Sequence, residues 1–263
     1  QIMEIEVPPR AQYLRTIWSE LSRIHSHLLW LGLTADAFGF ESLFMHSWRL
    51  REKVLDIIEA TTGGRVIFGS CKVGGVRRDI ENAALRTIAA TLQDYAKEYR
   101  EIGGVFLEDL TVKRRLCGVG VLSGEDALQL GAVGPMLRAS GVAQDMRLLK
   151  YAAYGEIDFS PVTAAEGDSY ARCSVRVREI FQSVGIIRQC AEKIPDGAIE
   201  TKVAGLPDGE FYARTEQPRG EVIYYVKANG TKNLERLRVR TPTFANIPAM
   251  LKVMPGCQLA DVP

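Results

Sequence analysis

The chain has 263 residues, of which 46% are hydrophobic and 25% are charged, and its formal net charge at pH 7 is +1. A chain of this length can bury a large apolar core in one domain or in two closely packed domains. The small net charge provides no basic field to attract nucleic acid, and the longest apolar stretches, such as 28–33, are too short to cross a bilayer. We therefore expect no nucleic-acid partner and no transmembrane helix.

Cysteines and histidines follow no metal-binding pattern. The five cysteines include no Cys-x-x-Cys pair, and the three histidines are not spaced as zinc or iron ligands. An odd number of cysteines also argues against a disulfide framework. We expect reduced thiols and no metal-binding site within this chain.

Apolar residues with a period of 3.6 predict four long amphipathic helices, which together imply a bundle. The apolar stripes lie within 10–33, 40–58, 80–102 and 170–194. Breaking residues predict where three of these helices end: Gly63-Gly64 after the second, Gly103-Gly104 after the third and Pro195 after the fourth.

Two regions interrupt the helical pattern. The short, β-branched segment 66–73 predicts a small strand excursion within 64–76, and 122–165 is irregular enough to predict only short helices and loops. From Ala198 the apolar period changes to two, and Asn229-Gly230 predicts a β-hairpin. The expected fold class is mainly α and α+β overall. A helical bundle over 1–197 would carry a small antiparallel β region, with a site-lining loop, over 198–263.

The first predicted helix carries a possible line of ionisable groups. His25 falls within its apolar stripe, while Glu20 and His27 lie on one flank of the helix, seven residues apart. A buried histidine paired with a carboxylate or carbonyl is the commoner arrangement. A buried Glu/His line also suits a proton path, because burial and partners can tune both groups toward neutral pH. Both interpretations stay open from the sequence.

Arginines on the predicted helices favour an ion-pair network between helices. Arg51 lies on the apolar face of the second helix, and the fourth carries charged residues at helical spacing, namely Asp168, Arg172, Arg176 and Glu179. A buried guanidinium stays charged and needs a carboxylate or carbonyl partner. By contrast, Asp79 is expected to cap the third helix.

Glu216-Gln217-Pro218-Arg219-Gly220 is a constrained loop that presents an arginine. Pro218 fixes the backbone, and Gly220 allows a close approach of another chain segment. Such a loop can aim the charged fork of Arg219 into a cavity. Taken alone, Pro-Arg-Gly is usually only a turn.

Five segments, taken in order, resemble the large subunit of membrane-bound, energy-converting nickel–iron hydrogenases of the formate hydrogenlyase type. They also resemble the related quinone-site large subunit of respiratory complex I, the 49 kDa subunit. The segments are RAQYLRTIWSELSRIHSHLLWLG (10–32), VGGVRRDI (73–80), VGPMLRASG (133–141), EQPRGE (216–221) and RTPTFANIP (240–248).

The resemblance implies roles for particular residues. The hydrogenases place an equivalent Pro-Arg against the metal centre, which implies that Pro218 and Arg219 are catalytic. The 240–246 loop would line the same cavity through Arg240, Thr241, Thr243 and Asn246, together with Arg10. The cysteine pairs that hold the metal in that family are absent, so we interpret the chain as a fragment lying between them, inactive and metal-free by itself.

The resemblance also implies partners, and it leaves three functions open. The parent complex would contain a nickel–iron centre, an iron–sulfur small subunit and membrane-embedded ion-pumping subunits. The chain would lie on the cytoplasmic side, peripheral to the membrane, and could self-associate through exposed partner faces. The first function is reversible H2 production. The alternatives are a quinone-site subunit of an NADH-quinone oxidoreductase and a metal-free structural scaffold.

Overall fold

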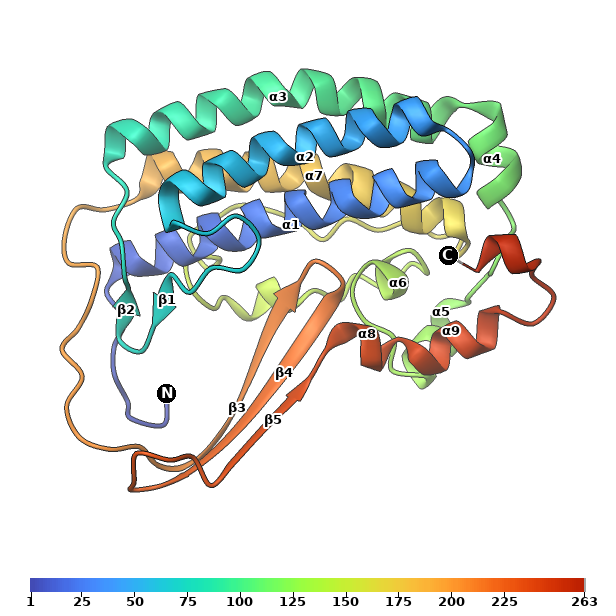
Figure 1. Cartoon of the computed structure of the whole chain (residues 1–263). Helices are drawn as coiled ribbons and strands as arrows, with labels where there is room; N and C mark the ends of the chain where they lie inside the picture. Colours follow the sequence, from blue (N-terminus) through green and yellow to red (C-terminus); the bar gives the residue numbers. More distant parts are fainter. Residues whose placement is uncertain (263) are drawn as a thin grey trace.

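The computed structural model describes residues 1–262, and a bundle of long helices dominates it (Figure 1). The long helices are α1 (Pro9–Ala37), α2 (Glu41–Thr62), α3 (Asn82–Glu108) and α7 (Ser169–Lys193). Helix α1 packs on α2 and α7, and α3 packs on α7 and α2. The apolar stripe of α1, including Leu14, Ile17 and Leu21, is fully buried in this core. The predicted bundle and the mainly α class are confirmed.

The end of α2 and the start of α7 follow the local sequence. Helix α2 ends at Gly63, which has a φ of 85°, and the side chain of Asp168 accepts a hydrogen bond from the Ala171 amide at the start of α7. Helix α3, however, continues through Gly103-Gly104, so the predicted end there was wrong. A Cβ on Gly103 would lie 2.8 Å from a methyl carbon of Val177 on α7. Gly103 therefore permits a close contact between helices rather than ending one.

Short helices and loops fill the region between α3 and α7, as the sequence predicted for 122–165. They are α4 (Leu110–Leu116), α5 (Gly124–Gln129), α6 (Pro135–Arg138) and the 3-10 helix η1 (Met146–Leu149). Asp109 and Ser123 cap α4 and α5 by accepting hydrogen bonds from backbone amides of the first turn.

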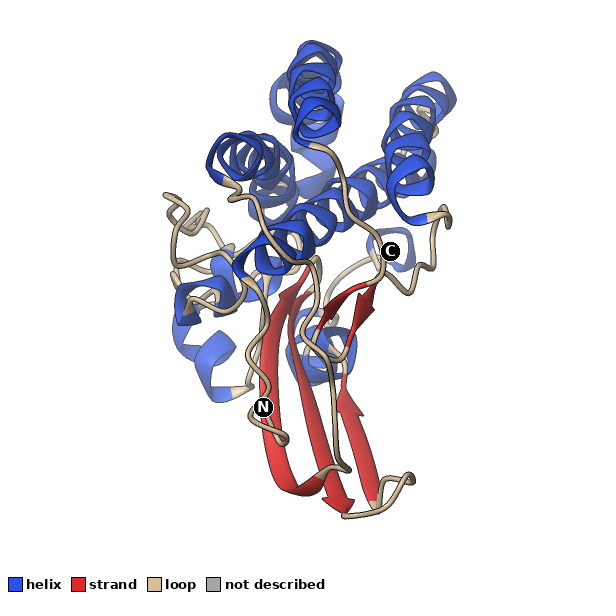
Figure 2. Ribbon diagram, turned by 90° about the vertical axis from the view of Figure 1, so that its left-hand side faces the viewer, coloured by secondary structure: helices blue, strands red, loops and turns tan. Residues whose placement is uncertain are grey.

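Two small antiparallel sheets complete the fold. Strands β1 (Cys71–Lys72) and β2 (Gly75–Val76) form the predicted excursion. Strands β3 (Asp208–Gln217), β4 (Gly220–Asn229) and β5 (Arg236–Arg240) pair in that order, and this second sheet projects away from the bundle (Figure 2). The β4–β5 connection begins at Asn229-Gly230, as predicted, whereas the sequence pattern did not single out β3.

The C-terminal segment is more helical than expected. After β5 the chain forms α8 (Pro242–Ala245), α9 (Ile247–Val253) and the 3-10 helix η2 (Leu259–Asp261). Pro242 occupies the first turn of α8, where its missing amide hydrogen costs nothing. Within residues 1–262, no helix is both long enough and apolar enough to cross a membrane.

Candidate functional site

Pro218 and Arg219 form the two-residue turn between β3 and β4. Gln217 pairs with Gly220 across the hairpin, so only these two residues connect the strands. The usual two-residue hairpin turns need a positive φ at their first position, which proline does not allow. The chain instead takes a positive φ of 125° at Gly220. The local sequence thus holds Arg219 at the tip of a rigid turn, with its side chain exposed.

The backbone of this turn packs directly against the backbone at Gly134. A Cβ on Gly134 would lie 2.4 Å from the Arg219 carbonyl oxygen, and equally close to the Cα of Gly220. On the same segment, the Val133 amide donates to Oδ1 of Asn246 at 2.8 Å, and Nδ2 of Asn246 donates to the Val133 carbonyl at 3.2 Å. The structure therefore brings the Pro218–Arg219 turn and Asn246 together around residues 133–134.

Arg10 lies elsewhere, and its expected place in the site wall was wrong. Its guanidinium donates to the Asp79 carboxylate at 2.8 Å and to the Ile80 carbonyl at 2.8 Å. Arg10 precedes His25 by fifteen residues on α1, which corresponds to about 22 Å along the helix axis. It ties the start of α1 to the segment leading into α3. Asp79 is Arg10's partner and does not cap α3, whose N-cap is Glu81.

Two of the other predicted residues, Arg240 and Thr241, stabilise the segment around α8. Arg240 donates to Glu221 at 2.7 Å, and Glu221 also pairs with Arg214. Thr241 caps α8 by accepting from the Phe244 amide at 3.3 Å, and Thr243 is exposed. Of the 240–246 segment, Asn246 is thus the residue that contacts the neighbourhood of the Arg219 turn.

Beneath the turn lies a cluster of charged side chains that are almost completely buried, which we call the buried network. Its members are Glu20, Arg23 and His27 of α1, Arg138 of α6, Asp145 and Arg147 at η1, Glu179 of α7 and Glu216 of β3. The sequence predicted a network through Glu179 but missed most of the other members. The Glu20–Arg23 spacing of three residues on one helix was the only local signal for them.

Glu20 is a central acceptor of the buried network. It accepts from Nε of Arg23 at 3.2 Å and from Nη1 of Arg147 at 3.3 Å, and the hydroxyls of Tyr154 and Ser183 also donate to it. Burial opposes the charge on this carboxyl, but Arg23 and Arg147 outweigh that effect and hold its pKa below the usual value. Glu20 is therefore ionised at neutral pH.

His27 is neutral and bonded to Glu179. Its Nε2 lies 2.7 Å from a carboxylate oxygen of Glu179, and Nε of Arg138 donates to the other oxygen at 3.0 Å. Burial lowers the pKa of His27 to about 4 although Glu179 favours its charged form. Ion pairs join Glu20 to Glu179, and so to His27, through Arg147, Asp145 and Arg138. Arginine does not release its proton at neutral pH, so these contacts favour an ion-pair network over a proton path.

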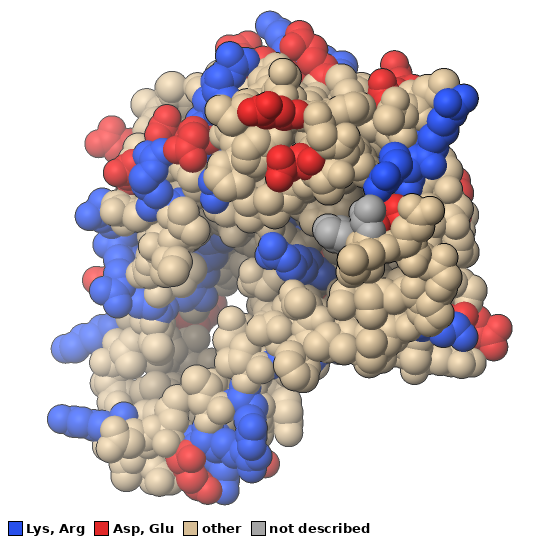
Figure 3. Space-filling view, turned by 45° about the vertical axis from the view of Figure 1, so that its right-hand side comes forward, with Lys and Arg blue, Asp and Glu red and all other residues tan. Residues whose placement is uncertain are grey.

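A second group of arginines, Arg172, Arg176 and Arg219, has no carboxylate partner, and we call it the basic wall. Within residues 1–262, no carboxylate lies within 4.0 Å of any of the three. Arg176 lies over the Trp30 ring, 4.3 Å from its centroid. Burial, together with the charge of Arg172, lowers the pKa of Arg176 to about 10. Figure 3 shows Lys and Arg side chains at the hollow between the bundle and the sheet.

His25 lies near the basic wall and contacts Arg51. Its Nε2 is 3.2 Å from Nη2 of Arg51. Burial, Arg51 and Arg219 together lower the pKa of His25 to about 4, so its Nε2 accepts a hydrogen bond from Arg51 at neutral pH. Among the described residues, no partner contacts its other ring nitrogen, which is buried.

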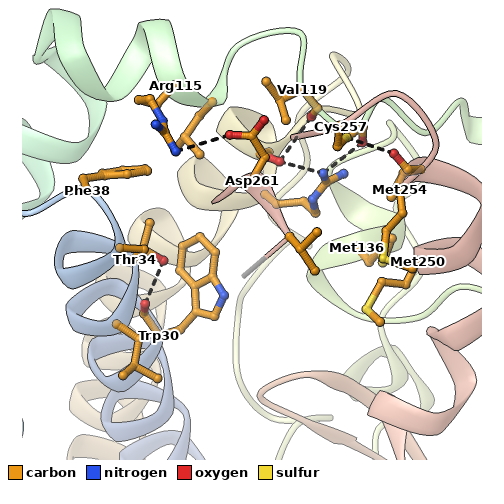
Figure 4. A pocket seen from close by; sticks show the side chains of 18 of the residues that line it. Trp30, Thr34, Phe38, Arg115, Val119, Met136, Met250, Met254, Cys257 and Asp261 are labelled. Carbon is orange, nitrogen blue, oxygen red and sulfur yellow. Dashed lines mark hydrogen bonds and ion pairs between the residues drawn. The ribbon is translucent and has the colours of Figure 1, made fainter. Parts of the chain in front are cut away.

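A cavity of about 330 Å³ lies beside the basic wall (Figure 4). Apolar side chains make most of its surface, including Trp30 of α1, Phe38 directly after α1, Met136 of α6 and Met250 of α9. Arg172 and Arg176 provide its cationic side, and Arg115 pairs with Asp261 at 3.3 Å. Arg219 is not among the lining residues, so the expectation that it points into a cavity shared with 240–246 does not hold for this one.

The donor groups of the site do not form a metal-binding set. Among the residues that the structure describes, no cluster of three or more His, Cys, Asp or Glu side chains is placed to hold a metal ion. The site's own chemistry is instead that of fixed cations beside an apolar cavity, which suits binding of an anionic or carbonyl-bearing group.

Comparisons with known proteins give the family. A family model for the 49 Kd subunit of respiratory-chain NADH dehydrogenase matches residues 37–206 and 201–263. The carbon monoxide-induced hydrogenase of Rhodospirillum rubrum is 40% identical over 98% of this chain and 72% of its own length. The alpha subunit of the membrane-bound hydrogenase of Pyrococcus furiosus is 38% identical over 98% of this chain and 65% of its own. A component of the NADH-quinone oxidoreductase of Phocaeicola vulgatus is 40% identical over 100% of this chain and 51% of its own. The chain belongs to the family of the respiratory-chain NADH dehydrogenase 49 Kd subunit, and its relatives include hydrogenase subunits, as its motifs predicted.

Proposed function

We propose that the chain forms part of the large subunit of a membrane-associated hydrogenase that produces H2 reversibly, with electrons from an iron–sulfur partner subunit. Two hydrogenases among its relatives support this proposal, one of them named as membrane-bound. The five sequence segments that resemble energy-converting hydrogenases support it as well.

The observation that carries the proposal is an arginine fixed on a rigid turn without a carboxylate partner among residues 1–262. Pro218 and Gly220 constrain the backbone, and the crossing at Gly134 prevents the turn from shifting toward α6. A guanidinium held in this way can bond an anionic group through two parallel N–H donors. The Arg219 side chain is exposed, so its guanidinium is free to meet an anionic partner outside the described residues.

A nickel–iron centre fits the basic wall, although this chain does not supply its ligands. Thiolates from elsewhere in the complex would hold the metals, with Pro218 and Arg219 beside them. When bound, the centre would supply the Lewis acid that splits hydrogen heterolytically. The residues of this chain would bind and orient: Arg219 would donate to an anionic ligand, while Asn246 fixes the neighbouring segment. The apolar side chains of Trp30 and Met136 would limit access of water.

A quinone-site function is the second candidate, and the cavity favours it. The cavity combines aromatic and methionine walls with the guanidinium groups of Arg172 and Arg176. A flat quinone head could stack on Trp30 or Phe38 while an arginine donates to its carbonyl oxygen. The NADH-quinone oxidoreductase relatives are consistent with this alternative. No observation specifically favours the metal-free scaffold.

The projecting sheet supports the proposed association with other subunits. Tyr224 faces Val239, and Val226 faces Leu237, on one side of the sheet. The side chains of Leu237, Val239 and Tyr224 remain 54%, 46% and 39% exposed, respectively. An apolar face of this kind suits an iron–sulfur subunit or a second copy. Membrane subunits would then hold the complex at the cytoplasmic face of the membrane.

Replacing Arg219 by Lys in the assembled complex tests the proposal. Lysine keeps the charge but loses the planar fork, so H2 production with a reduced dye should fall about 10²–10³-fold. The protein composition and the iron–sulfur content of the complex should not change. Near-normal turnover would remove the catalytic role of Arg219. A wild-type complex that reduces quinone and produces no H2 would establish the second candidate instead.

A further inference from the structure

We propose that Arg23 is a positioning residue that sets the place and orientation of the Pro218–Arg219 turn. This inference rests on the proposed function of Arg219. Arg23 lies on α1 and is fully buried. Its Nη2 donates to the Glu216 carbonyl at 3.0 Å, and its Nη1 donates to the Gln217 carbonyl at 3.2 Å.

These carbonyls belong to the last two residues of β3, directly before the turn. A guanidinium is planar, and its two terminal nitrogens point in fixed directions. Two parallel donors therefore fix both the distance and the tilt of the strand end relative to α1. With a connection of only Pro218 and Arg219, any tilt of that strand end moves Arg219.

Arg23 is not the only attachment of the sheet to the bundle. The Glu216 carboxylate accepts from Nη1 of Arg138 at 2.8 Å and from the Met146 amide at 3.0 Å. The Glu216 amide donates to the Tyr151 hydroxyl at 3.0 Å. Loss of the Arg23 fork should therefore leave the sheet attached through Glu216 while freeing the turn.

Unlike the arginines of the basic wall, Arg23 has a carboxylate partner among the described residues that balances its charge. Its Nε donates to Glu20 at 3.2 Å, and Glu20 also pairs with Arg147. Arg23 is thus neutralised locally, and its contacts to the strand end are to main-chain carbonyls. Arg23 can therefore affect turnover only by changing the position of Arg219.

The experiment compares Arg23→Lys with Arg147→Lys in the assembled complex. Both residues are fully buried and contact Glu20, but Arg147 makes no hydrogen bond to 216–220 within the described chain. Arg23 reaches Glu20 and the two carbonyls from three separate nitrogens, and the single nitrogen of a lysine cannot occupy all three positions. Amide hydrogen exchange in a peptide covering 216–221 should accelerate at least about tenfold in Arg23→Lys and stay unchanged in Arg147→Lys.

A double-mutant cycle on turnover separates positioning from general destabilisation. Arg23→Lys should lower kcat about tenfold in the wild-type background and have no further effect in the Arg219→Lys background. Arg147→Lys should have the same proportional effect in both backgrounds. Independent, multiplying effects of Arg23→Lys and Arg219→Lys, or unchanged exchange at 216–221, would overturn the proposal.

The outcomes also distinguish this inference from the proposed function. Normal turnover of Arg219→Lys alone would end the catalytic assignment, while the exchange comparison would still decide whether Arg23 holds the turn. If Arg23→Lys fails to assemble, Arg23→Gln replaces it, because Gln keeps one N–H-donating nitrogen and leaves Glu20 paired with Arg147. Failure of both variants to assemble would make Arg23 a folding residue and overturn the proposal.

Discussion

The arginines of the buried network and those of the basic wall lie in neighbouring parts of the molecule but differ in their partners. Arg23, Arg138 and Arg147 are fully buried, and each contacts at least one carboxylate. The basic wall, formed by Arg172, Arg176 and Arg219, has no carboxylate within 4.0 Å among residues 1–262. The paired group is therefore expected to support structure. In the basic wall, Arg172 also donates to the Gly120 and Gly167 carbonyls, so the expectation of a functional role applies most directly to the exposed Arg219.

The buried network contains one more carboxylate than it has arginines. Glu20, Asp145, Glu179 and Glu216 share the three guanidinium groups. Arginines hold the pKa of Asp145 and Glu179 below their usual values despite burial. For Glu216, burial prevails over Arg138 and raises the pKa. Among the acidic residues of the buried network, Glu216 is thus the one whose charged form is least favoured, and it lies two residues before Pro218.

The largest expected effect comes from removing a partner of the buried network. Glu179→Ala would leave Arg138 with one fewer carboxylate and His27 without its acceptor. Urea unfolding of the purified chain should show a loss of about 3–5 kcal/mol. Arg219→Ala, on the basic wall, should change stability by no more than about 0.5 kcal/mol. Equal losses for the two variants would break the distinction between the two groups.

A smaller effect is expected where the turn crosses Gly134. In Gly134→Ala, the new methyl group would overlap the backbone of Arg219 and Gly220, and the residue's φ of 65° already disfavours a side chain. We expect a loss of about 3 kcal/mol, together with reduced turnover of the assembled complex. Gly131→Ala is the matched control: its φ is 66° and nothing in the described chain lies within 4 Å. That control should lose only about 1 kcal/mol and keep its turnover.

The helices and the hairpin could be predicted from sequence because their signals are local. Apolar spacing placed α1, α2 and α7, and Asn229-Gly230 placed the β4–β5 turn. Gly103 misled the prediction because a glycine that ends a helix and one that lets α7 approach look alike in sequence. The third helix is also bounded by Glu81 rather than by Asp79.

The site could be predicted only in part, because its contacts join distant segments. The bond between Arg138 and Glu216 spans 78 residues, and that between Arg23 and the Glu216 carbonyl spans 193. No spacing rule pairs residues so far apart. Arg10 was assigned to the site through the family resemblance of segment 10–32, but one long helix carries the two ends of that segment far apart.

The smallest expected effect is on the pH dependence of stability, and it comes from His27 of the buried network. The folded-state pKa of His27 is lowered to about 4, from 6.5 when unfolded. Its contribution to stability is therefore present above pH 6.5 and is lost as pH falls toward 4. Between about pH 7 and pH 5 this loss should be about 2 kcal/mol. His27→Gln keeps a donor for Glu179 but has no group that titrates in this range. Its free energy of unfolding, measured with urea, should therefore fall by about 2 kcal/mol less than that of the wild type between pH 7 and pH 5. Identical pH dependence in both proteins would show that His27 is not held neutral.

The surroundings of Arg219 in the assembled complex test the central claim most directly. A cryo-electron microscopy structure of the complete complex would show what the basic wall faces. We predict that the Arg219 guanidinium lies within about 2.7–3.2 Å of an anionic ligand of the redox centre or of a quinone oxygen. The Arg23 fork should still contact the Glu216 and Gln217 carbonyls. Carboxylates of a partner subunit within ion-pair distance of Arg172, Arg176 and Arg219 would instead identify the basic wall as an ordinary subunit interface and contradict the account.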